Sequence, residues 1–453
     1  MSNPAQPSHA VAIIGGATAG AEVASRLADK NVEVTVFDMN PRPFGKIEDG
    51  LPRWHRALRQ KEYESIGARL SKPNIHFVPL TKIGHAVPFA ELAKDWGFSA
   101  VVLACGAWRD RPLPVEGADQ YLGNGLIYQN PFIIAFNHAG EADFPGERFE
   151  IKDGAMVIGG GLASIDVAKV LMLETTRAAL KKRGHEIDVE ELEKKGVPGV
   201  LEHLGLKWAD LGLKGCTLYY RRRPDDMPLM EVPEGATPER AAKVEQSRRH
   251  IINKAIEKFG FQFEPLAIPS GLIVEGGRLV GLRFNRAKVE GKKLITTDET
   301  FERRGTYIIS SIGSIPEAMP GVAMKGELFP FTDWDLGRME AFPKIFSAGN
   351  VVTGKGNIIA SRKHASHVAD VLAERYLGLD GAGHAGEEKM LEGVHAAHAE
   401  TAQRVAGEIV QLPRIESAAL AKVRERVKAR QQAVGYTGDF KSWLARVTPK
   451  GFA

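Results

Sequence analysis

The stretch VAIIGGATAGAEVASRL, residues 11–27, decides the first half of the fold. Its apolar start predicts a strand, and Gly15, Ala17 and Gly20 follow at the spacing of a G-x-G-x-x-G turn, with alanine at the middle position. The residues after the turn have helical periodicity. Gly15 permits a tight turn, and the helix N-terminus directs its free amides and the positive end of its dipole at a pyrophosphate. The stretch therefore predicts a nucleotide-binding strand-turn-helix unit.

Asp38 ends the next predicted strand, EVTVFD, and lies 18 residues after Gly20 (38 − 20). An acid at this place can accept hydrogen bonds from both ribose hydroxyls and would repel a 2′-phosphate. The alternative is that the glycines merely allow a helix and a strand to pack closely. Because strand, turn, helix, second strand and terminal acid all agree, the first turn favours FAD or NAD over NADP.

A second glycine turn lies in AMVIGGGLASIDVAKVLM, residues 155–172, with Gly159, Gly161 and Ser164 at the same spacing. Here the middle glycine is present, so the backbone can approach a pyrophosphate closely. The stretch again starts with an apolar run and continues with helical periodicity. It predicts a second nucleotide-binding unit.

The strand after the second turn ends in basic rather than acidic residues. It follows a charge-rich insertion, residues 177–214, and reads CTLYYRRRPDD, with Arg221, Arg222 and Arg223 at its end. Planar guanidinium groups suit bidentate phosphate recognition, so the cluster indicates a 2′-phosphate site and NADP. The alternative is a solvated basic loop. Opposite chemistry at the two strand ends indicates two different nucleotides.

Composition excludes several other classes. The 453 residues are 43% hydrophobic and 26% charged, enough for two or three domains, and the net charge of +4 argues against nucleic acid as the main partner. The two cysteines, Cys105 and Cys216, form no C-x-x-C motif, which argues against disulfide relays, iron–sulfur clusters and cysteine zinc sites. We expect no metal site. The start resembles no signal peptide and no apolar run could span a bilayer, so we expect a cytoplasmic protein without a membrane span.

The order of these motifs resembles the two-dinucleotide-fold flavoprotein reductases, in particular the adrenodoxin reductase-like ferredoxin–NADP reductases and the glutamate synthase small subunit. The match extends over about residues 10–376. FSAVVLACGAWRDRPLPVEG, residues 98–117, resembles the family's A-T-G turn and R-x-L-P-x-x-G crossover, with Cys105 where threonine is usual. GGGLASIDVAKVL resembles the NADP fingerprint, where Asp166 matches and Lys169 replaces arginine.

Two further motifs extend the resemblance. YYRRRPDDMP is similar to the family's arginine pair, and FPKIFSAGNVVTGKGNI resembles the last FAD motif, with Asn350 where aspartate is usual. PFGKIEDGLPRWHR resembles a stretch that carries a histidine near the flavin, matched here by His55. By resemblance, His55 and Asp166 are the polar candidates where flavin and nicotinamide meet, with tuning and positioning roles. The alternative for His55 is a surface histidine.

The resemblance implies an α/β fold of two Rossmann-like (three-layer ββα) domains, the NADP domain inserted in the FAD domain. We expect FAD-domain parts at residues 1–118 and 330–380, the NADP domain at 119–329 and a helical C-terminal extension at 381–453. The expected FAD contacts are Gly15, Ala17, Gly20, Asp38, Ala104, Gly106, Gly349, Asn350, Gly356, Asn357 and Ile358. The expected NADP contacts are Gly159, Gly161, Ser164, Arg221 and Arg222.

The C-terminal extension lies outside the resemblance. It predicts two helical stretches that clasp the chain's own core or a sister subunit, the latter giving a homo-oligomer. A second hypothesis makes a basic docking face for an acidic redox partner. That face would consist of Lys422, Arg424, Arg426, Lys428 and Arg430.

The resemblance implies an FAD enzyme that takes hydride from NADPH and passes single electrons to a ferredoxin-like iron–sulfur protein, or works in reverse. One alternative is an NAD(P)H-oxidising flavoprotein subunit of a larger redox complex. Another is a quinone or small-molecule reductase. A third, of a different class, is a regulatory module that binds both nucleotides without turnover.

Overall fold

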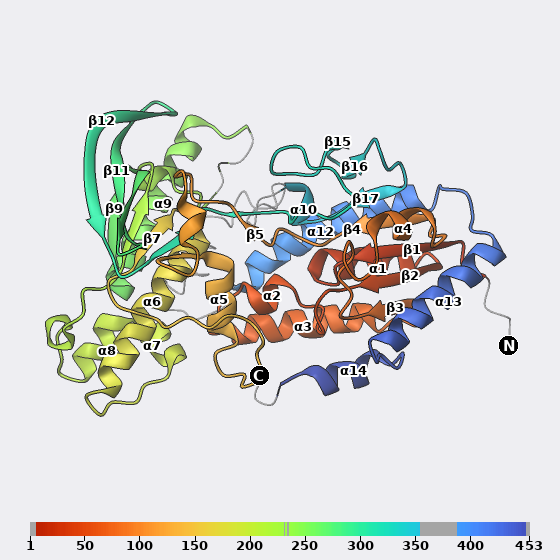
Figure 1. The fold of residues 1–453 in the computed structure, drawn as a ribbon, viewed down its shortest axis with the longest axis horizontal. Coiled ribbons are helices and arrows are strands. Elements are labelled where there is room, and N and C mark those ends of the chain that lie inside the picture. Colours follow the sequence, from red (N-terminus) through yellow and green to blue (C-terminus); the bar gives the residue numbers. More distant parts are fainter. Residues whose placement is uncertain (1–5, 231, 233–234, 354–386, 450–453) are drawn as a thin grey trace.

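The computed structural model describes residues 6–230, 232, 235–353 and 387–449. Two α/β lobes lie side by side, each around a five-stranded parallel sheet (Figure 1). The first sheet has the order β17-β4-β1-β2-β3. Its strands are β1 (His9–Ile14), β2 (Val32–Phe37), β3 (Ile75–Val78), β4 (Ala100–Leu103) and β17 (Ile345–Ser347). Every residue of β1 and β2 is buried, as expected for continuous apolar strands covered on both faces.

The first lobe surrounds this sheet with short helices and a small hairpin. Its helices are α1 (Thr18–Ala28), α2 (Lys46–Asp49), α3 (Arg56–Leu70), α4 (Phe89–Lys94) and α10 (Asn350–Thr353). The hairpin consists of β15 (Phe331–Asp333) and β16 (Arg338–Met339). Because β17 follows the whole second lobe in sequence and still pairs with β4, the second lobe is an insertion in the first.

The second sheet has the order β6-β13-β7-β8-β9. Its strands are β6 (Leu126–Tyr128), β7 (Met156–Gly159), β8 (Thr217–Tyr220), β9 (Gln262–Pro265) and β13 (Ile308–Ser311). The main helices of this lobe are α5 (Gln129–Asn137), α6 (Leu162–Lys181) and α9 (Pro238–Phe259). The charge-rich insertion folds into α7 (Val189–Lys195), α8 (Val197–His203) and the 3₁₀ turn η2 (Trp208–Leu211), with Val189, Leu192 and Leu201 in the core.

An antiparallel sheet covers the outer side of the second lobe. It consists of β10 (Ala267–Glu275), β11 (Arg278–Glu290) and β12 (Lys293–Arg304), which pair in that order as an antiparallel meander. Gly276 and Gly277 turn between β10 and β11 with positive φ angles of 56° and 78°, a conformation that favours glycine. Two remaining 3₁₀ turns are η1 (Ala118–Tyr121) and η3 (Pro224–Asp226).

The chain crosses between the lobes twice. β5 (Arg109–Asp110) carries it into the second lobe and β14 (Ser314–Ile315) brings it back, and the two strands pair antiparallel. The predicted fold class is therefore confirmed: two parallel α/β units, one inserted in the other, with a helical C-terminal region.

The C-terminal helices pack on the first lobe and run along its outer side (Figure 1). They are α12 (Glu387–Ile409), α13 (Ser417–Ala433) and α14 (Phe440–Val447). Val405 and Trp443 belong to the core on one face of the first sheet, and Val423 belongs to the core on the other face. The interpretation as a clasp on the chain's own core therefore describes these helices.

Three of the five residues of the hypothesised docking face on α13 contact the chain's own lobe, and docking of an acidic redox partner stays a prediction. Arg424 forms an ion pair with Glu33, with Nε and Oε1 2.9 Å apart. Arg430 Nε donates to Thr81 Oγ1 at 3.0 Å, and the guanidinium of Arg426 lies 5.8 Å from the Trp96 ring centroid. These cations hold α13 to its own lobe, since basic side chains between hydrophobic positions of a packed helix reach back over the core it covers. Among the described helices, none is both long and apolar enough to cross a membrane.

Candidate functional site

The first glycine turn joins β1 to α1 so closely that side chains are excluded. Gly15 has a φ of +103°, and a Cβ on it would lie 2.5 Å from the carbonyl oxygen of Ala104. A Cβ on Gly20 would lie 1.9 Å from the carbonyl oxygen of Gly15. No side chain caps the N-terminus of α1, so its first amides are available to an anion. The geometry fits a bound pyrophosphate.

The alanine at the middle position of this turn is matched by a glycine elsewhere. A Cβ on Gly45 would lie 2.8 Å from the Cβ of Ala17, and Gly45 has a φ of +52°. Ala17 therefore fits because the opposing segment has no side chain there. Sequence reasoning missed Gly45, because nothing local in P-F-G-K shows which segment it faces.

Asp38 follows β2 at the same end of the sheet and is 7% exposed. Its Oδ2 accepts a hydrogen bond from the amide of Gly16 at 2.8 Å, and its Oδ1 accepts one from the amide of Asn40 at 2.9 Å. Burial raises the pKa of Asp38 to about 6, although these two amides oppose the shift. At neutral pH the carboxylate is thus mainly ionised and fixed in orientation.

A pocket opens beside this turn. Its lining includes five of the expected FAD contacts, namely Gly15, Ala17, Asp38, Ala104 and Gly106. Asn40, Gly45, Trp108 and residues 317–320 also line it and were not predicted. The pocket thus extends from the ribose acid across the glycine turn to the segment after β14. The N-terminus of α1 has no side-chain cap, Asp38 lies at the expected ribose position, and the pocket runs past both. This arrangement fits an extended dinucleotide.

The last predicted FAD motif is only partly described. Gly349, with a φ of +78°, follows β17, and Asn350 begins α10, so both lie at the same sheet edge as Gly15. A Cβ on Gly349 would lie 2.8 Å from the Cβ of Ala19 in α1. Gly356, Asn357 and Ile358 lie outside the described residues.

The second glycine turn differs in which positions are crowded. A Cβ on Gly159 would lie 2.3 Å from the carbonyl oxygen of Ser311, and one on Gly160 would lie 2.2 Å from the ring of Tyr220. Around Gly161, by contrast, no atom lies within 4 Å of such a Cβ among the described residues. Ser164 is buried and its Oγ donates to the carbonyl oxygen of Gly161 at 2.8 Å. Gly161 therefore faces open space, as a pyrophosphate-contacting glycine should.

The arginines after β8 are held to different degrees. Arg223 Nε donates to Asp226 Oδ2 at 3.0 Å, and Arg222 Nη2 donates to the carbonyl oxygen of Lys292 at 3.1 Å. Arg221 is exposed and, among the described residues, forms no hydrogen bond or ion pair. No side chain caps the N-terminus of α6. The residues fit an NADP phosphate, with Arg221 as the available cation and Arg222 prepositioned beside it.

His55 and Asp166 both lie in one buried cluster where the lobes meet. His55 is fully buried, which overturns the surface-histidine alternative, and its Nε2 accepts a hydrogen bond from Trp54 Nε1 at 3.0 Å. Asp166 is 3% exposed, with its Oδ1 3.9 Å from Lys169 Nζ. Lys169 Nζ also donates to Glu193 Oε1 at 2.9 Å and lies 4.7 Å from the centroid of the Trp54 ring.

This burial bears on the roles of the two residues. Leu51, Trp54 and Leu58 of the first lobe belong to the same core as the helices of the second lobe. His55 and Asp166 are absent from the lining of the pocket at the first turn. The structure brings them together between the lobes, and a direct contact with nicotinamide stays a prediction.

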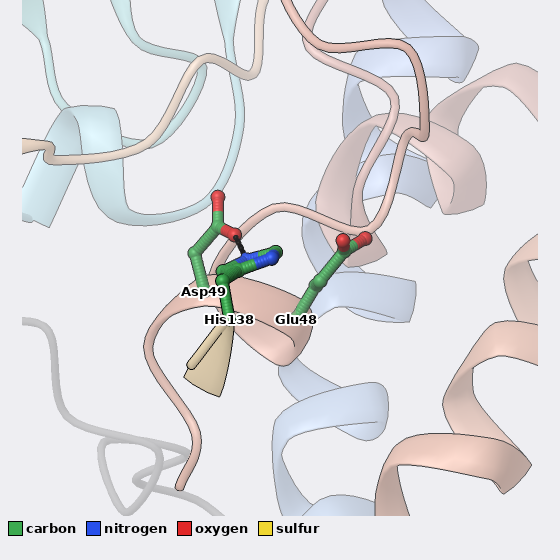
Figure 2. Close-up of side chains that lie close together, drawn as sticks. All are labelled: Glu48, Asp49 and His138. Atoms are coloured by element: carbon green, nitrogen blue, oxygen red, sulfur yellow. Dashed lines mark hydrogen bonds and ion pairs between the residues drawn. The ribbon is translucent and has the colours of Figure 1, made fainter. Parts of the chain in front are cut away.

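A second polar group lies between the lobes and could be mistaken for a metal site. Figure 2 shows Asp49 and His138 pointing toward one another beside Glu48; ligand atoms of the three lie within 4.8 Å of one another. Arg42 Nε donates to Glu48 Oε1 at 2.8 Å, so this carboxylate already has a cation. Burial alone would lower the pKa of His138, but the hydrogen bond to Asp49 raises it. The arrangement is that of an ion-pair network.

Comparisons with known proteins agree with this geometry. Residues 9–200 match the pyridine nucleotide-disulphide oxidoreductase family. The chain is 24% identical over 393 residues to the putative oxidoreductase AegA of Escherichia coli K12, covering 82% of this chain and 49% of that protein. It is 23% identical over 394 residues to the glutamate synthase [NADPH] small chain of the same organism, covering 82% and 69%.

Two further comparisons extend the agreement. Over 182 residues the chain is 29% identical to the mitochondrial NADPH:adrenodoxin oxidoreductase of Arabidopsis thaliana, covering 38% of this chain and 35% of that protein. The match thus spans about half or less of the length of these first relatives, the glutamate synthase chain excepted. The fold is similar to that of FprA from Mycobacterium tuberculosis in complex with NADPH, with a TM-score of 0.59, 19% identity, and coverage of 92% and 98%.

The expectations of an NAD(P)H oxidoreductase family, with FAD and NADP as the family's cofactors, are confirmed by these relatives. So is the resemblance drawn from the glycine turns and the crossover motif. The chain is therefore similar to the two-dinucleotide-fold reductases, with the NADPH:adrenodoxin oxidoreductases and the glutamate synthase small chains among its relatives.

Proposed function

We propose that the protein is an FAD-dependent oxidoreductase that moves hydride between NADP(H) and FAD and exchanges single electrons with a ferredoxin-like iron–sulfur protein. One observation carries the proposal. Two uncapped helix N-termini follow two glycine turns, and the adjoining strands end in a buried acid, Asp38, and in an exposed arginine, Arg221. Opposite charges at the two ribose positions select different nucleotides.

The residues divide the work between binding and orientation. Asp38 would hold the adenosine ribose of FAD. The amides at the N-terminus of α1 would hold the pyrophosphate of FAD. Arg221 and Arg222 would hold the 2′-phosphate of NADP, and Gly161 leaves room for its pyrophosphate. When bound, FAD supplies the chemistry, accepting two electrons as hydride and releasing them singly.

We further assign residues 1–118 and 330–380 to the FAD domain, 119–329 to the NADP domain and 381–453 to the extension. The assignment is supported by sheet membership, since β1–β4 and β17 share one sheet and β6–β9 and β13 share the other. His55 and Asp166 would act as positioning residues, supported by their shared cluster between the lobes. Both cysteines are free thiols, Cys105 partly and Cys216 fully buried, which supports a cytoplasmic location.

Anaerobic stopped-flow reduction of the flavin tests the proposal. We expect NADPH to bleach the flavin absorbance much faster than NADH does, and a ferredoxin added afterwards to restore it. A flavin that neither nucleotide bleaches would make the protein a binding module without turnover. Equal rates with NADH and NADPH would contradict the assignment of the arginines.

A second candidate is the reductase subunit of a larger redox complex. It is favoured by the length comparison, because the chain matches only 49% of the AegA protein. Co-purification of a stoichiometric partner that accepts electrons from the flavin would support it. Reoxidation by quinones or small molecules, with no response to ferredoxin, would instead make the protein a quinone or small-molecule reductase.

A further inference from the structure

The two crossings between the lobes are bonded to each other beside the first glycine turn. Asp110 of β5 is opposite Ser314 of β14, and the amide of Arg111 donates to the carbonyl oxygen of Gly313 at 2.9 Å. In Figure 1, β5 lies between the two lobes. The two covalent connections between the lobes are therefore joined in one short ribbon.

Lys46 joins this ribbon to both lobes. It begins α2 in the first lobe, and its Nζ donates to Asn130 Oδ1 at 3.2 Å and to Ser314 Oγ at 3.1 Å. Asn130, in the first turn of α5 in the second lobe, donates its backbone amide to Asp110 Oδ2 at 3.2 Å. Its Nδ2 also donates to Ser314 Oγ at 3.1 Å. We name Lys46, Asp110, Asn130 and Ser314 the crossover ring.

The ring touches the proposed FAD site at one side. Gly45, which precedes Lys46, and Trp108 both line the pocket at the first turn. Lys46 Nζ lies 5.6 Å from the centroid of the Trp108 ring, and Asn130 Nδ2 donates to the carbonyl oxygen of Trp108 at 2.9 Å. Sequence reasoning missed the ring, because its members come from four segments that only the fold brings together.

The charges around Lys46 leave it poorly compensated. Among the described residues, no carboxylate lies within ion-pair distance of its Nζ, and Asp110 is the charged group that acts on it. Burial lowers the pKa of Lys46 to about 8, opposed by Asp110, and raises the pKa of Asp110 to about 6. An ammonium retained under these conditions points to a role beyond packing.

The other elements around Lys46 offer little that titrates near pH 8. On α2 itself, Glu48 is engaged by Arg42 and Asp49 by His138. α5 and β14 present the neutral groups of Asn130 and Ser314, and the side chain of Arg109 on β5 is exposed.

We propose that Lys46 is a positioning residue whose ammonium group fixes the two crossover strands to both lobes and so sets how the second glycine turn faces the first. The proposal rests on the proposed hydride transfer, for which a misplacement of 1 Å can cost about 100-fold in rate. Charged hydrogen-bond donors bind about twice as strongly as neutral ones, so the ring weakens when Lys46 loses its proton.

The test compares Lys46→Met and Lys46→Arg with the wild-type holoenzyme over pH 6 to 9.5. We expect the limiting rate of flavin reduction by NADPH to fall in the wild type as the pH rises through 8. In Lys46→Met the rate should be about tenfold lower and flat across this pH break. Lys46→Arg should restore the rate and move the break to higher pH, because guanidinium keeps its proton. Lys30→Met, at an exposed lysine, is the matched control.

Amide hydrogen exchange of the holoenzyme gives a readout independent of turnover. Lys46→Met should speed exchange in residues 109–111 and 313–315 and leave β1 and β7 unchanged. Ser314→Ala, which removes one acceptor only, should act in the same direction and more weakly. A wild-type pH profile in Lys46→Met, or unchanged exchange in the ribbon, would overturn the proposal. If NADPH fails to reduce the wild type, the proposed function fails, and exchange still decides the role of the ring.

Discussion

The two glycine turns have the same order of strand, turn and helix, but they differ in which positions leave room for a side chain or a ligand. In the first, the third position is closed, because a Cβ on Gly20 would meet a backbone oxygen at 1.9 Å, and the middle position carries Ala17 opposite Gly45. In the second, Ser164 occupies the third position with its hydroxyl bonded to Gly161, and the middle position faces open space. The first turn thus packs tightly against its own backbone, whereas the second leaves space for a ligand at its middle position.

The ends of the following strands sharpen the contrast. The first carries a buried acid whose two oxygens are already fixed by backbone amides, and the second carries Arg221, whose side chain is exposed. A buried carboxylate makes a rigid contact with a resident nucleotide. Exposed guanidinium groups suit a nucleotide that must bind and leave in each cycle. The similarity of the two folds therefore does not extend to the charge and exposure of the residues that end these strands.

The largest predicted effect is a substitution at the third position of the first turn, compared with one at the third position of the second turn. Gly20→Ala should prevent FAD retention and destabilise the first lobe by about 3 kcal/mol, because the added Cβ meets backbone that cannot move aside. Ser164→Ala should change the free energy of unfolding by about 1 kcal/mol, the value of one hydrogen bond. The FAD content of the purified variants measures retention of the cofactor, and urea unfolding measures the change in stability. A Gly20→Ala protein that keeps its FAD would show that the first turn is as tolerant as the second.

The next largest effect concerns nucleotide choice. The double variant Arg221→Ala, Arg222→Ala should lower the ratio of kcat/KM for NADPH to that for NADH by about 100-fold, since two charged hydrogen bonds to phosphate are lost. Steady-state kinetics with both nucleotides and one electron acceptor measure the ratio. Arg223→Ala is the control, because Arg223 is bound to Asp226 and should leave the ratio within about twofold of the wild type.

Both turns were predictable because their chemistry is local. Each signal can be read from a short stretch of sequence: the glycine spacing, the apolar run before it, or the charged end of the next strand. In the structure these features lie at one end of each sheet. The fit of Ala17 against Gly45, the crossover ring around Lys46 and the bond between Arg424 and Glu33 were not predictable. Arg424 and Glu33 are 391 positions apart in sequence, so no periodicity or motif relates them. His55 could be assigned by resemblance only, and its complete burial follows from core packing across the lobes.

A smaller effect tests how Asp38 holds its nucleotide. FAD affinity should fall about tenfold between pH 7 and pH 5, because protonation through a pKa of about 6 removes an ionised acceptor. Asp38→Asn should bind FAD with the weaker affinity at both values. Fluorescence titration of the apoprotein with FAD measures this.

Stability of the apoprotein should move in the opposite direction to FAD affinity. The folded pKa of Asp38 is raised, so the ionised carboxylate costs stability fully above pH 6, and this cost is relieved as the pH falls toward the unfolded value of 3.8. The difference in free energy of unfolding between the wild type and Asp38→Asn isolates the contribution of Asp38 ionisation to stability. If that difference is independent of pH from 7 to 4, Asp38 does not titrate as assigned.

The smallest predicted effect concerns what covers the two lobes. The first lobe is held by the C-terminal clasp, whereas the second is covered by its own insertion, so loosening the clasp should affect the first lobe alone. Although burial would raise the pKa of Glu33, hydrogen bonds from His76 and Arg424 lower it to about 2. Since the folded pKa is depressed, the stabilising contribution is complete above the unfolded value of 4.5 and is lost as the pH falls toward 2.

Arg424→Ala should therefore lower the free energy of unfolding by about 1 kcal/mol at pH 7, a modest value because the arginine side chain is 55% exposed and solvent screens the pair. At pH 3 the loss should be smaller, since nearly all of Glu33 is then protonated in the unfolded chain and the pair contributes less. Lys422→Ala, at an exposed neighbour on α13, is the matched control and should change neither value. Urea unfolding followed by tryptophan fluorescence measures both, and hydrogen exchange of β3 against β8 locates the effect. A loss that spreads equally to β8 would mean that the clasp stabilises both lobes, through contacts other than the Arg424–Glu33 pair.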